Sequence, residues 1–251
     1  MGTLLTKFYA KYSSPRLLKV ARERNLDFEW VVEAGCHDGT DTLEFLKLPN
    51  IKRVFAFEPD DVAADKAQAK FTNCTKERVD LKRLALMDQP GFIEISSPTG
   101  NFGDGTTVIS NFKSVRPISG DNEKLLICST MDIELPNLTG RGLLWLDVEG
   151  SAADVLSGSL ETLKSVSLIQ VEVDMHTSKH RKANFAKVDK ILSKSNFSII
   201  FGPLHPGCFG DAMYLKNSHL TGWGRLKSLA LKYLYLILHL VIYPLTFRPR
   251  G

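Results

Sequence analysis

Acidic residues recur in this chain at or just after short apolar runs, where the strands of a parallel sheet would end. In chain order the groups are Glu33, Glu58-Pro59-Asp60, Asp147-Val148-Glu149 and Glu172-Val173-Asp174. Because ligands of doubly wound sheets bind outside the carboxyl ends of the strands, we expect these side chains to gather at one site. A carboxylate there can hydrogen-bond a sugar hydroxyl, attract a cationic ligand or accept a proton.

The first group belongs to a turn, residues 33–39 (EAGCHDG), with glycines at positions 35 and 39. These glycines allow close approach of the backbone to a ligand. The phosphate-binding patterns GxGxxG and GxxxxGK[ST] do not occur, and Asp38 adds negative charge, so the turn favours a neutral or cationic ligand over a pyrophosphate.

Glu58 follows Gly35 by 23 residues, a spacing typical of a strand-end carboxylate that binds a ribose diol. S-adenosylmethionine combines such a ribose with a positively charged sulfonium and ammonium. A GxxxG turn or a strand-end acid alone is weak evidence, because many turns and helix caps contain them. Their order on successive strands predicts S-adenosylmethionine as the ligand.

The elements that would position these residues alternate between apolar strands and amphipathic helices, the order of βα units. Residues 91–120 are rich in Gly, Ser, Thr and Asn and are expected to form a hairpin and loop. The pattern predicts an α/β fold, a Rossmann-like, doubly wound and mostly parallel sheet with a closing antiparallel hairpin. The predicted strands are residues 28–34, 53–57, 79–84, 143–147, 168–173, 197–201 and 212–215, and the predicted helices are residues 40–48, 61–71, 152–163 and 184–194.

On these residues the chain resembles the FkbM-type methyltransferases, a family of the class I S-adenosylmethionine-dependent superfamily, over roughly residues 30–215. Glu33, Cys36 and His37 stand where that family usually has Asp, Ala and Asn, which leaves the role of His37 open. The motifs that carry the resemblance are residues 33–39, 57–60, 85–88 with Gly91, 129–132, 146–150 with 155–158, and 171–173.

The resemblance implies methylation of a hydroxyl on a sugar, a glycan or a polyketide-type metabolite. Glu33, Gly35 and Gly39 would lie at the methionine end of the cofactor, Glu58 would hold the ribose, and Ala85 would lie beside the adenine. Asp147 and Glu149 would face the methyl group and the acceptor. The remaining residues expected at the cofactor are Cys36, His37, Pro59 and Asp60.

A general base would activate the acceptor hydroxyl, and the candidates are Asp147, His176 and Glu149. We favour Asp147, as base or cofactor anchor, with His176 second. Asp147 could instead cap the helix that follows it, and His176 could be an ordinary loop residue. Asp147, Glu149, Asp174 and His176 could also bind a divalent cation, although we expect no metal.

The net charge of +4 conceals two parts of opposite sign. Residues 179–251 carry 12 Lys and Arg against two Asp, a charge of +10, and residues 1–178 carry −6. Residues 229–247 are apolar apart from Lys232 and His239. A helix of residues 225–247 would pack on the domain, form a homodimer or contact a membrane surface, with a membrane span the least favoured reading.

The expected domains are a helical lead-in (residues 1–27), an S-adenosylmethionine-dependent methyltransferase domain (28–217) and a basic apolar helix (218–251). The four scattered cysteines and the lack of a signal-peptide pattern favour the cytoplasm. The sequence indicates no nucleic-acid substrate. Two other functions stay open, a nucleotide-cofactor oxidoreductase on a similar sheet and a non-catalytic membrane-associated scaffold.

Overall fold

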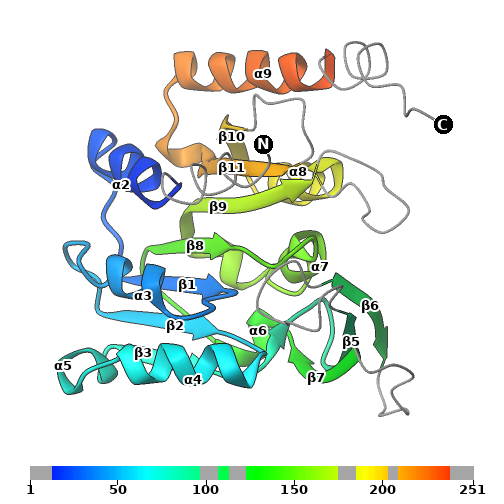
Figure 1. The fold of residues 1–251 in the computed structure, drawn as a ribbon. Helices are drawn as coiled ribbons and strands as arrows, with labels where there is room; N and C mark the ends of the chain where they lie inside the picture. The colour runs from blue at the N-terminus through cyan, green and yellow to red at the C-terminus, as the bar shows by residue number, and fades with distance from the viewer. Residues whose placement is uncertain (1–12, 97–106, 113–122, 175–184, 203–208, 238–251) are drawn as a thin grey trace, which may run out of the picture.

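The computed structural model describes residues 13–96, 107–112, 123–174, 185–202 and 209–237, and all structural statements concern these residues. Its main sheet has seven strands in the order β10-β11-β9-β8-β1-β2-β3 (Figure 1). Strands β3, β2, β1, β8 and β9 are parallel, and β11 is antiparallel to both β9 and β10. The predicted doubly wound sheet with a closing hairpin is therefore confirmed. The strands are β1 (Trp30–Ala34), β2 (Arg53–Phe57), β3 (Val79–Lys82), β8 (Gly142–Leu146), β9 (Val166–Asp174), β10 (Phe197–Phe201) and β11 (Phe209–Lys216).

Helices cover both faces of this sheet, because its central strands are apolar on both sides. All five residues of β1 and all five of β8 are buried. Helices α2 (Ser13–Glu23) and α3 (Thr40–Phe45) pack on one face through Leu17 and Phe45. On the same side α4 (Asp61–Lys70) packs on β2, with α5 (Asn73–Lys76) after it. The opposite face is covered by α6 (Met131–Glu134), α7 (Ala152–Ser157), the 3₁₀ turn η1 (Thr162–Lys164) and α8 (Phe185–Lys194).

A second sheet of four strands lies at the carboxyl ends of β1 and β2 (Figure 1). Its strand order is β4-β7-β5-β6, with β5 and β6 paired as an antiparallel hairpin. This confirms the hairpin expected within residues 91–120, although residues 97–106 and 113–122 lie outside the described part. The strands are β4 (Ala85–Leu86), β5 (Gly91–Ser96), β6 (Thr107–Phe112) and β7 (Glu123–Ser129).

Two predicted helices are shorter than expected. The helix expected at residues 40–48 ends at Phe45. We expected residues 152–163 to be continuous, but α7 ends at Ser157 and η1 begins at Thr162. Gly158 lies between them, where a Cβ atom would come 2.2 Å from the backbone oxygen of Met87. This close approach brings α7 against the start of the small sheet.

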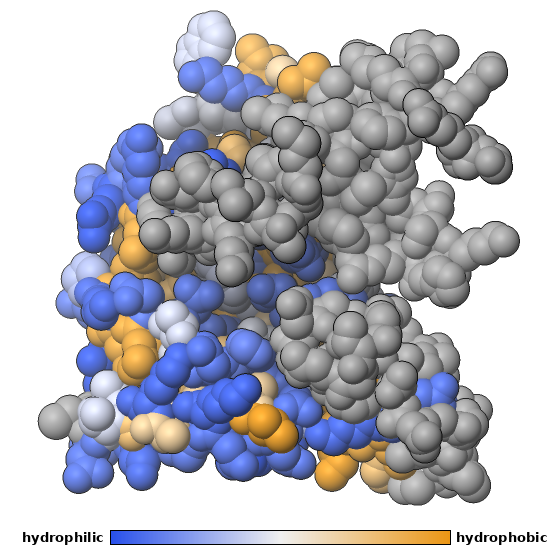
Figure 2. All heavy atoms as spheres, in the orientation of Figure 1, coloured by the Kyte–Doolittle hydropathy of each residue, from blue (hydrophilic) through white to orange (hydrophobic). Residues whose placement is uncertain are grey.

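Near the carboxyl end, the 3₁₀ turn η2 (Asn217–His219) leads into α9 (Gly222–Ile237), which runs beside β10 (Figure 1). Ser228 is buried, and Lys232 pairs with Asp189 of α8 at 2.6 Å. The outer face carries Trp223 and other exposed large apolar residues. Figure 2 shows hydrophobic residues in orange, beside polar ones, at this end of the molecule. Within the described residues, no helix is long and apolar enough to cross a bilayer. The expectation for residues 238–247 lies outside the described part.

Candidate active site

A cavity of about 780 Å³ opens at the carboxyl ends of β1, β2 and β8 and extends to the small sheet. The chain leaves β1 for β2 on one side, and β8 pairs with β1 on the other, so this is the point where the strand order reverses. Crevices at such switch points are the usual ligand sites of open α/β sheets. The cavity therefore lies where the strand-end acids were expected to gather.

The glycine turn after β1 forms the floor of the cavity. The backbone N–H groups of Gly35 and Cys36 both donate to the carbonyl oxygen of Phe57, at 2.9 and 3.1 Å. Gly35 has a φ of 82°, and a Cβ atom on it would lie 1.9 Å from the backbone oxygen of Asp147. The turn therefore requires glycine at this position, both for its backbone angle and for its contact with the loop after β8.

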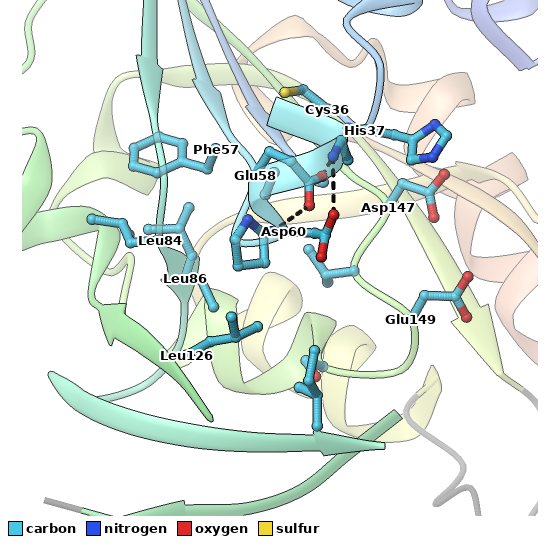
Figure 3. Close-up of a pocket in the computed structure, with 18 of the residues that line it drawn as sticks. Cys36, His37, Phe57, Glu58, Asp60, Leu84, Leu86, Leu126, Asp147 and Glu149 are labelled. Carbon is cyan, nitrogen blue, oxygen red and sulfur yellow. Dashed lines mark hydrogen bonds between the residues drawn. The ribbon is translucent and has the colours of Figure 1, made fainter. Parts of the chain in front are cut away.

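The carboxylate of Glu58 is fixed by two backbone donors (Figure 3). The N–H of His37 donates to Oε2 at 2.8 Å, and the N–H of Asp60 donates to Oε1 at 2.9 Å. His37 has a φ of 48°, a left-handed conformation that Asn and His adopt more readily than most residues. His37 thus acts through its backbone in holding Glu58. A carboxylate accepts more than two hydrogen bonds, so Glu58 keeps capacity for ligand hydroxyls.

Asp60 connects the main sheet to the small sheet. Its Oδ1 accepts from the N–H of Ala63 at 2.9 Å and so caps α4. Its Oδ2 accepts from Nζ of Lys124 on β7 at 3.0 Å. Burial opposes ionisation of Asp60, but these two donors lower the pKa of its carboxyl below the usual value.

One end of the cavity is apolar and the other is acidic. Figure 3 shows Leu84, Leu86 and Leu126 on one side, and Asp147 and Glu149 on the other. The apolar end lies between the strand ends and the small sheet, and its wall also contains Ala85, Met87, Ile93 and Ile95.

Asp147 follows β8 directly, and its backbone N–H donates to the carbonyl oxygen of Ala34 at 3.0 Å. Burial raises the pKa of Asp147 to about 7, and the nearby carboxylates of Glu149, Asp211, Asp41 and Glu58 add to the effect. The cap of α7 is Ser151, so Asp147 does not cap that helix. Asp147 is thus an acid in the cavity wall whose residue is open to water, while the protein and the carboxylates around it raise its pKa toward neutrality.

Two of the residues expected at the cofactor are set back from the cavity wall. Glu33 is 1% exposed, and its Oε2 accepts a hydrogen bond from Oγ1 of Thr42. Burial raises the pKa of Glu33 well above its usual value. Gly39, with a φ of 73°, is the N-cap of α3. Their roles toward a cofactor stay predictions.

The other expected residues among those described line the cavity together: Gly35, Cys36, His37, Glu58, Pro59, Asp60, Ala85, Asp147 and Glu149. Cys36 is buried, and burial raises the pKa of its thiol far above the usual range. His176 lies outside the described residues, as does the side chain of Asp174. No group of three or more His, Cys, Asp or Glu side chains in the described part is arranged to hold a metal ion.

Sequence reasoning missed Asp41, Lys124 and Asp211 as residues of this region. Asp41 lies in the first turn of α3 and lines the cavity. Lys124 belongs to β7, which was not predicted. Asp211 lies on β11, which begins three residues earlier than expected. An antiparallel strand starts at the edge where parallel strands end, and this rule would have identified Asp211.

Comparisons of the sequence with a family model and with a curated protein both identify methyltransferases. The sequence model of the methyltransferase FkbM domain matches residues 33–199. The 2-O-methyltransferase NoeI of Sinorhizobium fredii (strain NBRC 101917 / NGR234) is 30% identical over 158 residues, 57% of this chain and 62% of that protein. The chain thus aligns with less than two thirds of that relative's length.

Two of the solved structures with a similar arrangement are methyltransferases by name. Methyltransferase FkbM from Methylobacillus flagellatus KT has a TM-score of 0.49 and 17% identity, covering 75% of this chain and 43% of that chain. Magnesium protoporphyrin IX methyltransferase from Synechocystis PCC 6803, solved with S-adenosylmethionine bound, has a TM-score of 0.42 and 12% identity, covering 81% and 77%.

Proposed function

Because the chain belongs to the methyltransferase FkbM family, we propose that it transfers a methyl group from S-adenosylmethionine to a hydroxyl of a sugar, a glycan or a related metabolite. The observation that carries the proposal is the single cavity that joins the fixed carboxylate of Glu58 to the titratable carboxyl of Asp147. The printed name of the relative NoeI, a 2-O-methyltransferase, supports an oxygen acceptor.

The lining of the cavity fits S-adenosylmethionine at both ends. In the described part, six carboxylates and one lysine, Lys66, line the cavity, a balance that favours a sulfonium and an ammonium over a phosphate. Glu58 presents oxygens for the ribose hydroxyls, and the leucine-rich end suits an adenine ring. The acidic loop of Asp147 and Glu149 would then lie near the methyl group.

S-adenosylmethionine supplies an activated methyl group, which a hydroxyl oxygen attacks as the carbon–sulfur bond breaks. The protein's task is orientation of the two reactants, because this displacement needs no covalent enzyme intermediate. Asp147 would accept the hydroxyl proton through its carboxylate. A pKa of about 7 suits a base that works near neutral pH.

Calorimetric titration tests the cofactor directly. We expect S-adenosylmethionine and S-adenosylhomocysteine to bind, NAD⁺ not to bind, and Glu58→Gln to weaken both binding ligands about tenfold through loss of a charge-assisted hydrogen bond. Asp65→Asn on the exposed side of α4 serves as the matched control. Binding of NAD⁺ in place of S-adenosylmethionine would favour an oxidoreductase and contradict the proposal.

Mass spectrometry of glycan and metabolite extracts tests the reaction. Extracts incubated with the protein and methyl-labelled cofactor should gain labelled CH₂ on an oxygen. Cofactor binding without any labelled product would favour the non-catalytic scaffold.

We also propose that the outer face of α9 makes the contact with a membrane surface or a second copy of the chain. Trp223 is 75% exposed, and Leu226, Leu229, Tyr233 and Leu234 extend the same apolar face. The described helix carries Arg225, Lys227 and Lys232 and no acidic residue. Removal of residues 225–251 should then change the oligomeric state or the membrane partition of the chain.

A further inference from the structure

A row of acids crosses three neighbouring strands on the face of the sheet that α2 and α3 cover. On this face β8 presents Leu143 and Trp145, and β11 presents Leu215 and Met213. Side chains alternate along a strand, so the next residues toward the cavity edge on the same face are Asp147 and Asp211. Polar residues thus continue an otherwise apolar face where the strands reach the cavity.

The strand register aligns these acids with one another. Leu146 of β8 lies beside Val171 of β9, so Asp147 is next to Glu172 by continuation. Glu172 lies directly opposite Asp211 of β11. Neighbouring strands are about 4.8 Å apart, so two strand spacings, roughly 10 Å, separate the backbones of Asp147 and Asp211. That distance suits a ring with hydroxyls on two sides better than a single hydroxyl.

Behind this acidic row lies Gln170, whose amide has no protein partner among the described residues. Gln170 is 2% exposed, and neither Oε1 nor Nε2 forms a hydrogen bond of acceptable geometry. Burial raises the pKa of Asp211 to about 6, and the nearby Gln170 amide lowers it in part, although the two groups do not meet hydrogen-bond geometry. Buried amides nearly always have a partner, so an unpartnered one beside this acidic row indicates a ligand group.

The charges around Asp211 come from two helices. Arg16 of α2 lowers the pKa of Asp211 through its positive charge, and Asp41 of α3 raises it through its negative charge. Arg16 is also stacked over the ring of Phe201, with 4.2 Å between the guanidinium carbon and the ring centroid. Arg16 is therefore held partly by Phe201, and Asp211 lacks a close ion pair in the described structure.

We propose that Asp211 and Gln170 bind a second hydroxyl of the methyl acceptor. The acceptor site then extends from Asp147 across β9 to β11 and selects polyhydroxylated rings over simple alcohols. Asp211 accepts a hydrogen bond from that hydroxyl, and the amide of Gln170 completes its hydrogen bonding. This inference rests on the proposed function, because it requires methyl transfer to a hydroxyl beside Asp147.

The test compares two kinds of acceptor in the full-length chain. The polyhydroxylated probes are methyl glycosides of glucose, galactose, mannose and fucose, and cyclohexanol is the probe with one hydroxyl. We expect kcat/KM at least tenfold higher for the best glycoside than for cyclohexanol. Asp211→Asn should raise KM for that glycoside about tenfold, the range of a hydrogen bond to a charged group, and leave the KM of cyclohexanol and S-adenosylmethionine binding unchanged. Both acceptors are compared well above pH 7, because Asp211 contributes to the raised pKa of Asp147.

Gln170→Met provides a second variant of similar shape, in case Asp211→Asn folds poorly. It should raise the glycoside KM in the same way, and Asp65→Asn on α4 is the control that should change neither acceptor. Equal effects on both acceptors, or none, would overturn the inference, as would cyclohexanol matching the glycosides. If the wild-type chain binds S-adenosylmethionine but methylates neither these probes nor the glycan and metabolite extracts, the proposed function fails and the inference fails with it. If glycosides are methylated but respond to Asp211→Asn no more than cyclohexanol does, the inference alone fails.

Discussion

Three glycines near the cavity distinguish two physical reasons why a position requires glycine. One reason is a left-handed backbone angle, and the other is a close contact at the position of the Cβ atom. At Gly35 both reasons apply, since its φ is 82° and a Cβ atom would lie 1.9 Å from the backbone oxygen of Asp147. At Gly150 only the backbone angle applies, because φ is 91° and no atom lies within 4 Å of the Cβ position. At Gly158 only the contact applies, because φ is −88° and the Cβ would lie 2.2 Å from the Met87 oxygen.

Alanine at these sites should therefore cost different amounts of unfolding free energy. A left-handed backbone costs a non-glycine residue about 1–2 kcal/mol. Forcing a methyl group against fixed backbone costs about 1–3 kcal/mol. The loss of freedom in the unfolded chain is the same for all three substitutions and cancels in the comparison. We expect about 1–2 kcal/mol for Gly150→Ala, about 1–3 for Gly158→Ala and about 2–5 for Gly35→Ala.

Urea unfolding followed by circular dichroism measures these three costs without ligand. Calorimetry then measures cofactor affinity, which should fall about tenfold in Gly35→Ala, equivalent to about 1.4 kcal/mol, because Gly35 lines the cavity. A Gly35→Ala cost no larger than that of Gly150→Ala would refute the reasoning, because the contact with Asp147 would then have no energetic consequence.

Three further predictions concern other parts of the chain. Asp147→Asn should keep cofactor binding and lower turnover about 10²–10⁴-fold, and normal turnover in the variant would exclude Asp147 as the base. In the wild type, kcat/KM should rise with pH and reach a plateau above pH 7. Gln170→Met should raise the free energy of unfolding by about 1 kcal/mol, since it removes an unpartnered buried amide, and a lower melting temperature would contradict this. Trp223→Asp with Leu226→Asp should abolish any dimer in ultracentrifugation or any cosedimentation with anionic vesicles, and unchanged association would exclude α9.

The pKa of Asp147 also sets the sign of a stability change. Its folded pKa of about 7 lies above the ordinary value of 3.8, so the folded protein binds the proton more tightly. The contribution of Asp147 to the free energy of unfolding is therefore fully present at low pH, and it is lost as the pH rises from about 4 through 7. Asp147→Asn lacks this carboxyl and should lose less stability between pH 5 and pH 8 than the wild type, a difference that denaturant unfolding at both pH values would measure.

The sequence predicted the parallel strands well because each is a short apolar run bounded by turn residues. Residues 53–57 match β2 at both ends, and the strand predicted at 143–147 differs from β8 by one residue at each end. The small sheet was predicted only in part. Within β7, Leu126 and Cys128 are buried and Ile127 is exposed, an alternation that the preceding run of Gly, Ser and Asn obscured.

The candidate site was predictable where it depends on the ends of parallel strands. Glu58 and Asp147 follow directly from strand position. The start of β11 places Asp211 at the same edge, but its alignment with Glu172 and the position of Gln170 depend on the register between β11 and β9, and register between distant segments leaves no local pattern. The role of His37 depended on one backbone angle, which the residue type alone does not specify.

Asp60 after β2 and Asp147 after β8 respond differently to a fall in pH. Asp60 is held by Lys124 and by the start of α4, and its lowered pKa keeps it ionised wherever the protein is folded at moderate pH. Asp147 has acids for neighbours and changes charge near neutrality. In the proposed reaction, a pH below about 7 would therefore protonate Asp147 and lower turnover, while the ion pair of Asp60 with Lys124 between the two sheets would persist. Turnover would be lost without unfolding of the protein, and it would return when the pH rises.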